Sequence, residues 1–176
     1  MWYMTIQTTG IVNDFGDLQI ASHHVAGASS STRGVFGGGV SPSGTTISYN
    51  TIQTTGNAID FGDFEHNRQM TGGTANATRG VFVHGSSPLA NYISYVTIAT
   101  LGNAIDFGDA TNALRDNTSA ASSTRALTGV GGYDNSINQN TIDYVEKATT
   151  GNAIDFGDLT DERNALEGQS NGHGGL

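Results

Sequence analysis

One eight-residue sequence, Gly-Asn-Ala-Ile-Asp-Phe-Gly-Asp, occurs three times in this chain. The copies lie at Gly56–Asp63, Gly102–Asp109 and Gly151–Asp158, and a diverged copy, Gly-Ile-Val-Asn-Asp-Phe-Gly-Asp, lies at Gly10–Asp17. The four copies start 46, 46 and 49 residues apart. Near-identity at a regular spacing of this size is the signature of a repeat architecture, so we expect the chain to fold as a series of similar units.

The repeat extends well beyond this motif. A tyrosine lies seven residues before the first glycine of each copy, and in three repeats a Thr-Arg pair follows further along. The tyrosines are Tyr3, Tyr49, Tyr95 and Tyr144, and the arginines are Arg33, Arg79 and Arg125. On these positions the repeats cover 3–48, 49–94, 95–143 and a shorter 144–176, which together make one repeat domain over 1–176.

Four short strands are predicted in each repeat, and examples cover 78–83, 91–99, 103–107 and 110–120. The first three alternate apolar with polar residues and are rich in β-branched and aromatic side chains. The fourth is ambiguous, because its first residues could instead form a helical turn. Four strands in 46–49 residues match the size of a β-propeller blade, so an all-β fold is predicted.

Composition limits the classes of partner. Charged residues make up 13% of the chain, about half the usual share of roughly 25%, so hydroxyl and amide groups are expected to dominate the polar surface. The net charge of −9 disfavours binding to nucleic acid or to an anionic membrane, which both require a basic surface. The chain contains no cysteine, which excludes disulfides and thiolate metal sites. Neither a signal peptide nor a transmembrane segment is expected from its apolar runs.

The block Tyr-x-Thr-Ile-x-Thr-x-Gly-Asn-Ala-x-Asp-Phe-Gly-Asp, together with Ser-Ser-Ser-Thr-Arg-Gly-Val-Phe-Gly-Gly-Gly at 29–39, resembles a known type of repeat. It is similar to kelch-like β-propeller repeats in tail-associated and uncharacterised virion proteins of cyanobacterial and marine phages. The resemblance covers the whole chain, although those proteins carry many more copies. It implies kelch-like four-stranded blades and a virion or extracellular location, and it supplies no catalytic residues.

The number of blades raises the question of ring closure. The chain holds about 3.5–4 blades, whereas a propeller typically closes with about 4–8. Dimerisation into a ring of seven or eight blades is the interpretation that we favour, since each copy would supply half. A four-bladed monomer and a unit of an extended assembly are the alternatives.

The aspartates of the motif have two interpretations. With Asn57, the carboxylates of Asp60 and Asp63 could bind Ca²⁺, which prefers carboxylate and amide oxygens. Alternatively, the motif serves turns and packing, since Asp accepts backbone hydrogen bonds and Gly adopts positive φ. We favour the second interpretation and expect no metal or cofactor. The positions given a structural role are Asp60, Phe61, Asp63, Asp106, Phe107, Asp109, Arg79 and Arg125.

The arginines could line a binding face or could join neighbouring blades. Each repeat has one such arginine and two aspartates, which suggests a guanidinium–carboxylate pair within or between blades. We favour this Arg–Asp pair and expect Arg79→Ala to lower thermal stability. The five histidines share no repeat position, so a symmetric metal site is not expected.

Three aromatic residues, Trp2, Tyr92 and Tyr133, lie outside the repeated positions. Such unrepeated aromatics among Asn, Ser and Gly are candidates for contact with a carbohydrate. The favoured function is therefore a non-enzymatic structural or binding module that contacts a host-surface glycan or other virion proteins. A glycan-active enzyme would instead need an unrepeated carboxylate pair, and an engineered or excised fragment of a longer repeat protein is a further alternative. The unrepeated carboxylates of note are Glu65, Glu146, Asp161, Glu162 and Glu167.

Overall fold

The computed structural model describes residues 1–5, 8–40, 44–86, 88–129, 131–132, 138–168 and 170. These residues form 14 strands and no helix, which confirms the predicted all-β class. Among them there is consequently no apolar helix of a length that could cross a membrane.

The strands form one two-stranded and three four-stranded antiparallel sheets. The N-terminal pair consists of β1 (Trp2–Tyr3) and β2 (Asn13–Asp14). Sheet 1 contains β3 (Ala26–Ser29), β4 (Arg33–Gly37), β5 (Thr46–Thr51) and β6 (Ile59–Asp63). Sheet 2 contains β7 (Gly72–Ala75), β8 (Arg79–Gly85), β9 (Ala90–Thr97) and β10 (Ile105–Asp109). Sheet 3 contains β11 (Thr118–Ala121), β12 (Arg125–Gly129), β13 (Gln139–Glu146) and β14 (Ile154–Arg163).

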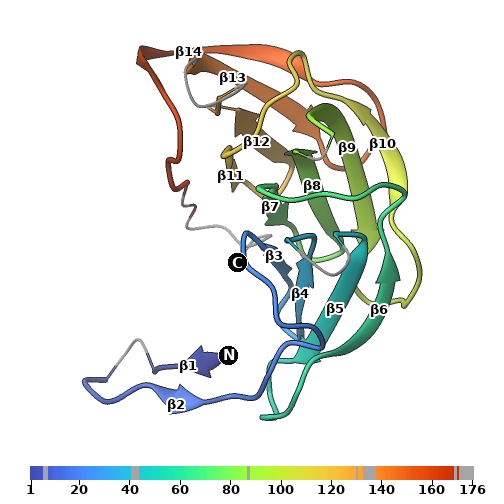
Figure 1. The fold of residues 1–176 in the computed structure, drawn as a ribbon, viewed down its shortest axis with the longest axis vertical. Helices are drawn as coiled ribbons and strands as arrows, with labels where there is room; N and C mark the ends of the chain where they lie inside the picture. The colour runs from blue at the N-terminus through green and yellow to red at the C-terminus, as the bar shows by residue number, and fades with distance from the viewer. Residues whose placement is uncertain are drawn as a thin grey trace.

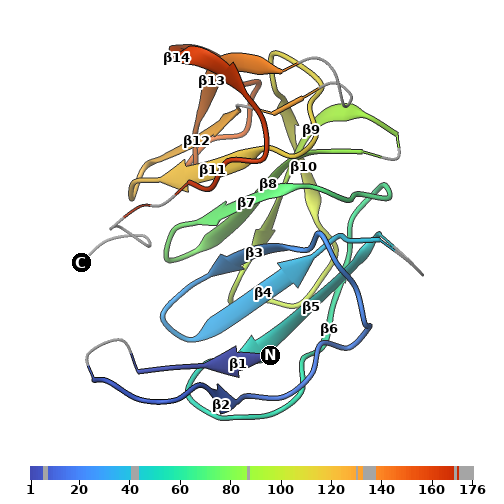
Figure 2. The ribbon, with the colours of Figure 1, turned by 60° about the vertical axis from the view of Figure 1, so that its left-hand side comes forward.

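The sheets stand face to face in an open arc (Figure 1). Their first strands, β3, β7 and β11, lie next to one another on the concave side, and β6 and β10 lie on the convex side. Figure 2 shows how sheets 1, 2 and 3 stack one above another. The N-terminal pair occupies one end of the arc and β14 the other, and residues 164–168, drawn in red, run back along the open side. The blade-like sheets are therefore compatible with a propeller-like arrangement.

Sheet 2 is covered on both faces by apolar side chains. Because neighbouring residues of a strand point to opposite faces, Val81 and Phe82 contribute to different clusters. Phe82 and Ile98 pack with Val35 of sheet 1, whereas Val81 packs with Val145 of sheet 3. All five side chains are fully or almost fully buried. Alternation along the strands thus places one hydrophobic layer in each space between sheets.

Two details of the predicted strands need correction. The strand expected at 103–107 is β10, which begins only at Ile105, because the preceding Gly-Asn-Ala segment bonds to sheet 1 rather than to its own sheet. The ambiguous segment 110–120 forms no helical turn, and β11 begins at Thr118. Just before this strand, Asp116 has a φ of 52°, and its repeat equivalents His24 and Met70 have φ values of 59° and 57°. A left-handed residue at this position interrupts a regular helix.

Candidate functional site

The repeated motif forms the junction between successive sheets at the convex edge. The backbone N–H of Gly102 donates to the carbonyl of Phe61 at 2.9 Å, and that of Ala104 donates to the carbonyl of Asp63 at 2.9 Å. In return, the backbone N–H of Asp63 donates to Oδ1 of Asn103 at 3.0 Å. The same three bonds recur at the other two junctions. The pairs there are Gly56 with Phe15, Ala58 with Asp17, Asn57 with Asp17, Gly151 with Phe107, Ala153 with Asp109 and Asn152 with Asp109.

Close packing between the sheets explains why the motif has a glycine at its centre and a phenylalanine before it. Gly62 has a φ of +147°, and a Cβ atom on it would lie 2.4 Å from the carbonyl oxygen of Gly102. Phe61 is buried and meets Tyr49 edge-on, with ring centroids 5.8 Å apart. Phe107 repeats this contact with its own tyrosine at 5.8 Å. The motif therefore brings two sheets into backbone contact and fills the space behind that contact.

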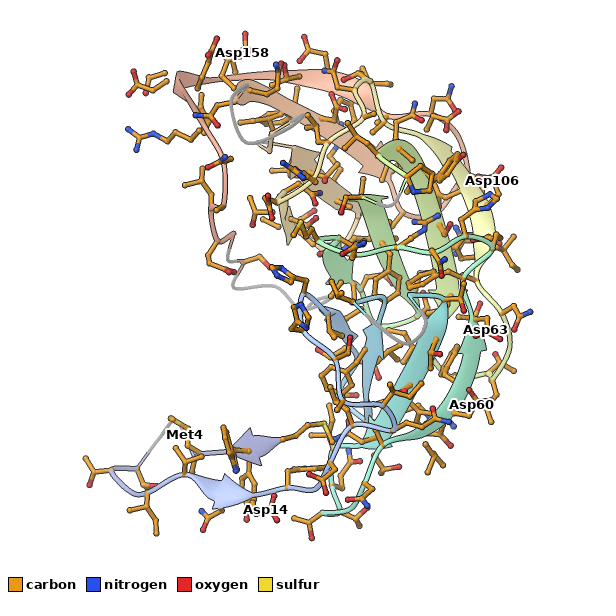
Figure 3. The ribbon with its side chains drawn as sticks, in the orientation of Figure 1. Met4, Asp14, Asp60, Asp63, Asp106 and Asp158 are labelled. Atoms are coloured by element: carbon orange, nitrogen blue, oxygen red, sulfur yellow. The ribbon has the colours of Figure 1, made fainter. Side chains whose placement is uncertain are left out.

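The first aspartate of the motif accepts a local hydrogen bond. Oδ1 of Asp106 accepts the backbone N–H of Gly108 at 3.2 Å, and Asp14 and Asp155 make the equivalent bond at 3.1 and 2.9 Å. In Figure 3 the labelled aspartates are spread around the convex edge of the arc. Within the described part of the chain, no three His, Asp or Glu side chains gather to hold a metal ion. Such hydrogen bonds between an aspartate and the backbone two residues later are typical of turns.

We expect neither millimolar calcium chloride nor EDTA to change the melting temperature. The carboxylates of Asp14, Asp106 and Asp155 each accept a bond from their own backbone, and the copies lie on separate sheets, so the described residues offer no compact set of oxygen ligands. Thermal melts followed by circular dichroism, with magnesium chloride as the ionic-strength control, measure the effect. A melting temperature that rises with calcium alone would contradict this expectation.

The arginines join neighbouring sheets, but the predicted Arg–Asp pair is wrong. Nη1 of Arg79 donates to the carbonyl of Lys147, the residue after β13 of sheet 3, at 2.7 Å, and its guanidinium lies 4.6 Å from the ring centroid of Tyr95. Arg33 likewise donates to the carbonyl of Ile98 at 2.8 Å. The tyrosine is the diagonal cross-strand neighbour of the arginine, whereas the aspartates lie one strand further out.

Arg125 differs because the described residues form no further sheet beyond sheet 3. Its Nε donates to Oε1 of Glu146 at 2.6 Å, and this hydrogen bond raises the pKa of the guanidinium. Its guanidinium still stacks on Tyr144, 4.6 Å from the ring centroid. Stacking of the arginine on the tyrosine therefore occurs in all three repeats. The hydrogen bond to a backbone carbonyl forms only where another sheet follows, as it does for Arg33 and Arg79.

Arg79→Ala is expected to lower the free energy of unfolding by about 1–3 kcal/mol, through loss of one charged hydrogen bond and one cation–π contact. Urea denaturation measures this loss. Arg125→Ala is the matched control, since it removes the stacking at an exposed end but no bond between sheets. Equal effects of the two substitutions would argue against a joining role for Arg79.

A buried lysine was missed by the sequence reasoning. Lys147 is fully buried, and its Nζ donates to the carbonyls of Ala75 at 2.5 Å and Ser122 at 3.0 Å. Burial lowers the pKa of Lys147 to about 8. The available signal was the replacement of an isoleucine, since Ile52 and Ile98 hold the equivalent positions of the repeat.

Sheet 2 carries a polar cluster around a buried arginine that the other repeats lack. Nη2 of Arg68 donates to Oγ of Ser94 at 2.6 Å, and Ser94 donates to Oε2 of Glu65 at 3.0 Å. Burial lowers the pKa of Arg68, with Glu65 opposing that shift from 3.8 Å. The rings of His66 and Tyr92 lie beside this group, with centroids 4.8 Å apart. Arg68, His66 and Tyr92 have no counterparts in the other described repeats, whereas the Ser94–Glu65 bond recurs there as Ser48–Gln19 at 3.1 Å and Asp143–Thr111 at 2.8 Å.

The two predicted ligand-contacting aromatics that the structure describes, Trp2 and Tyr92, are not brought together. Trp2 lies in β1 and is 78% exposed, whereas Tyr92 lies in β9 and is half-buried against His66. Figure 1 places these strands in different parts of the arc. Tyr133 lies outside the described residues. The cluster around Tyr92 is therefore the candidate binding site that retains a predicted residue.

Three of the candidate catalytic carboxylates lie beside arginines. Glu65 lies beside Arg68, Glu146 beside Arg125 and Asp161 beside Arg163, at 3.8, 2.6 and 3.2 Å. Each of these carboxylates thus has its own cationic partner.

No family model matches this sequence, and no curated protein matches it.

Proposed function

We propose that this chain is a non-enzymatic structural and binding module built from kelch-like propeller blades. In this proposal it belongs to a phage virion or tail-associated assembly, in a virion or extracellular setting. Its partners are a host-surface glycan or other virion proteins. The resemblance of the repeat supplies the viral part of the proposal, and the contacts supply the rest.

The observation that carries the proposal is the use of the repeated residues. Backbone groups of Phe61 and Asp63, the side chain of Asn103 and the guanidinium of Arg79 all bond one sheet to the next. These repeated residues therefore hold the sheets together. A stack joined in this way is a rigid support on which unrepeated side chains can contact a partner.

The unrepeated side chains of the cluster in sheet 2, Arg68, His66 and Tyr92, support a binding role. His66 is exposed, and its stacking on Tyr92 creates an aromatic surface next to the carboxylate of Glu65. An aromatic face combined with hydrogen-bonding groups suits the apolar faces and hydroxyls of a sugar. A glycan is therefore the ligand class that we propose for this surface.

We further propose that two copies complete a ring of seven or eight blades, with a four-bladed monomer as the alternative. The open arc of three four-stranded sheets and one pair supports this proposal. Size-exclusion chromatography with light scattering measures the mass. A species with the mass of one chain at micromolar concentration would contradict the dimer.

A glycan array probed with the labelled protein tests the binding function. We expect retained binding to one class of glycan and no released saccharide when the bound glycan is analysed by chromatography. Tyr92→Ala should abolish binding, and Tyr95→Phe, which leaves the cluster intact, is the control. Release of saccharide would contradict a non-enzymatic role, and binding unaffected by Tyr92→Ala would contradict the proposed surface.

A further inference from the structure

We infer that the two ends of the arc are complementary docking surfaces through which separate copies of the chain bind one another. The C-terminal end of one copy would bind the N-terminal end of a second copy of this chain. This inference rests on the proposed assembly with a second copy and assigns its contact surfaces. It follows from a comparison of each end with the internal junctions of the same molecule.

The C-terminal end exposes residues that the repeat buries elsewhere. Phe156 is 54% exposed, whereas its equivalents Phe61 and Phe107 are 3% and 2% exposed. A hollow of about 230 Å³ opens on the same sheet, and Leu127 and Ile142 line it. At the equivalent positions of sheet 2, the side chains are buried against sheet 3. This apolar face is matched in chemistry to the face of a further repeat.

The backbone of this end offers the free half of a junction. A Cβ atom on Gly62 or Gly108 would lie 2.4 or 2.5 Å from the carbonyl oxygen of the glycine in the next copy of the motif. A Cβ atom on Gly157 would meet no atom within 4 Å, although its φ of +136° is similar. The Phe-Gly-Asp segment that starts at Phe156 therefore has the shape of an acceptor with an open site.

The segment after β14 continues the inner row of strands. A Cβ atom on Gly168 would lie 2.7 Å from the carbonyl oxygen of Ser119, as one on Gly73 would lie 2.5 Å from that of Gly27. Ala165 has the positive φ, 52°, that precedes each first strand. A first-strand position thus exists beside β11. By the repeat, β1 and β2 correspond to β5 and β6, the third and fourth strands of sheet 1. The N-terminal pair of a second copy could therefore supply the third and fourth strands of a sheet that begins with this segment.

The N-terminal end carries the complementary surface. Met4 and Val12 occupy the repeat positions of Val96 and Ala104, which pack in the layer between sheets 1 and 2. Val96 and Ala104 are 2% and 6% exposed, whereas Met4 and Val12 are 60% and 48% exposed. The end therefore shows apolar side chains at the positions that face a preceding sheet.

The two surfaces lie far apart within one copy. Figure 3 labels Met4 at one end of the arc and Asp158 at the other, on either side of the opening. A second copy is therefore the occupant that brings them together. Ile11 replaces the capping asparagine of the motif, so this junction would have fewer hydrogen bonds and more apolar contact than the internal ones.

Engineered cysteines test this contact directly, since the chain contains none of its own. Ile11 and Asp158 correspond to Asn103 and Asp63, whose side-chain oxygen and backbone nitrogen lie 3.0 Å apart. In the double variant Ile11→Cys/Asp158→Cys, mild oxidation should produce disulfide-linked dimers or longer head-to-tail species on non-reducing gels. A disulfide within one chain, or no disulfide at all, would overturn the inference.

Two further variants sharpen the result. Ile11→Cys/Asp109→Cys is the matched control and should not cross-link, because Asn152 already caps the backbone of Asp109. Gly157→Ala should weaken association about tenfold or more, since its methyl group would meet the docking glycine of the second copy. If the Ile11→Cys/Asp158→Cys variant elutes as a dimer yet never forms a disulfide between its two engineered positions, these surfaces are overturned and the proposed dimer still stands.

Discussion

Replacing Gly62 with alanine is expected to lower the free energy of unfolding by about 3–5 kcal/mol. The φ of +147° at this position is unfavourable for any residue with a Cβ atom. The new methyl group would also lie 2.4 Å from the carbonyl oxygen of Gly102, so the junction between sheets 1 and 2 would have to open. Three backbone-directed hydrogen bonds depend on that junction.

The variant Gly157→Ala separates the cost of backbone strain from the cost of the clash between sheets. Gly157 has a φ of +136°, but a Cβ atom there would meet no neighbour within 4 Å. At a protein concentration low enough to keep the chain monomeric, this variant should lose only about 1 kcal/mol, from backbone strain. Urea denaturation of both variants measures the difference. Equal losses would show that backbone conformation, rather than contact between sheets, explains the glycine of the motif.

The motif shows what a sequence pattern can and cannot predict. Spacing and alternation correctly predicted an all-β chain and strands near 79–85 and 90–97. Identical copies could not indicate which copy bonds to which, because that depends on how the sheets stack. Asn103 and Ala104 were therefore assigned to the strand predicted at 103–107, although their hydrogen bonds go to Asp63 of the preceding sheet.

The arginine partner was missed for a similar reason. Counting one arginine and two aspartates per repeat suggested an ion pair, but charge counts contain no information on register. In the sheet, Val81 pairs with Tyr95, which makes that tyrosine the diagonal neighbour of Arg79. The candidate binding cluster was only partly predictable, since Tyr92 stood out as unrepeated whereas Arg68 is defined by its burial.

Lys147→Ile is expected to raise the free energy of unfolding at pH 7 by about 1–4 kcal/mol. A fully buried ammonium group with carbonyl partners carries a desolvation cost that a well-packed apolar side chain avoids. Isoleucine is the natural replacement, because Ile98 fills the same repeat position between sheets 1 and 2 and is 1% exposed. Glu146→Thr, which restores the repeat residue at the exposed neighbouring position, is the control and should change stability little.

The pH dependence of this difference identifies its cause. Lys147 has a pKa of about 8 in the folded protein, compared with 10.5 for an unperturbed lysine. Between these values the unfolded chain binds more protons, so the stability of the parent protein rises with pH across this range. The difference corresponds to about 3 kcal/mol, with the full cost present below pH 8. We therefore expect the advantage of Lys147→Ile to be largest below pH 8 and to shrink toward pH 10.5.

Because both proteins share all other titrating groups, urea denaturation of the pair across this range isolates the contribution of Lys147. An advantage that stays constant with pH would show that improved packing, rather than relief of a buried charge, stabilises the variant.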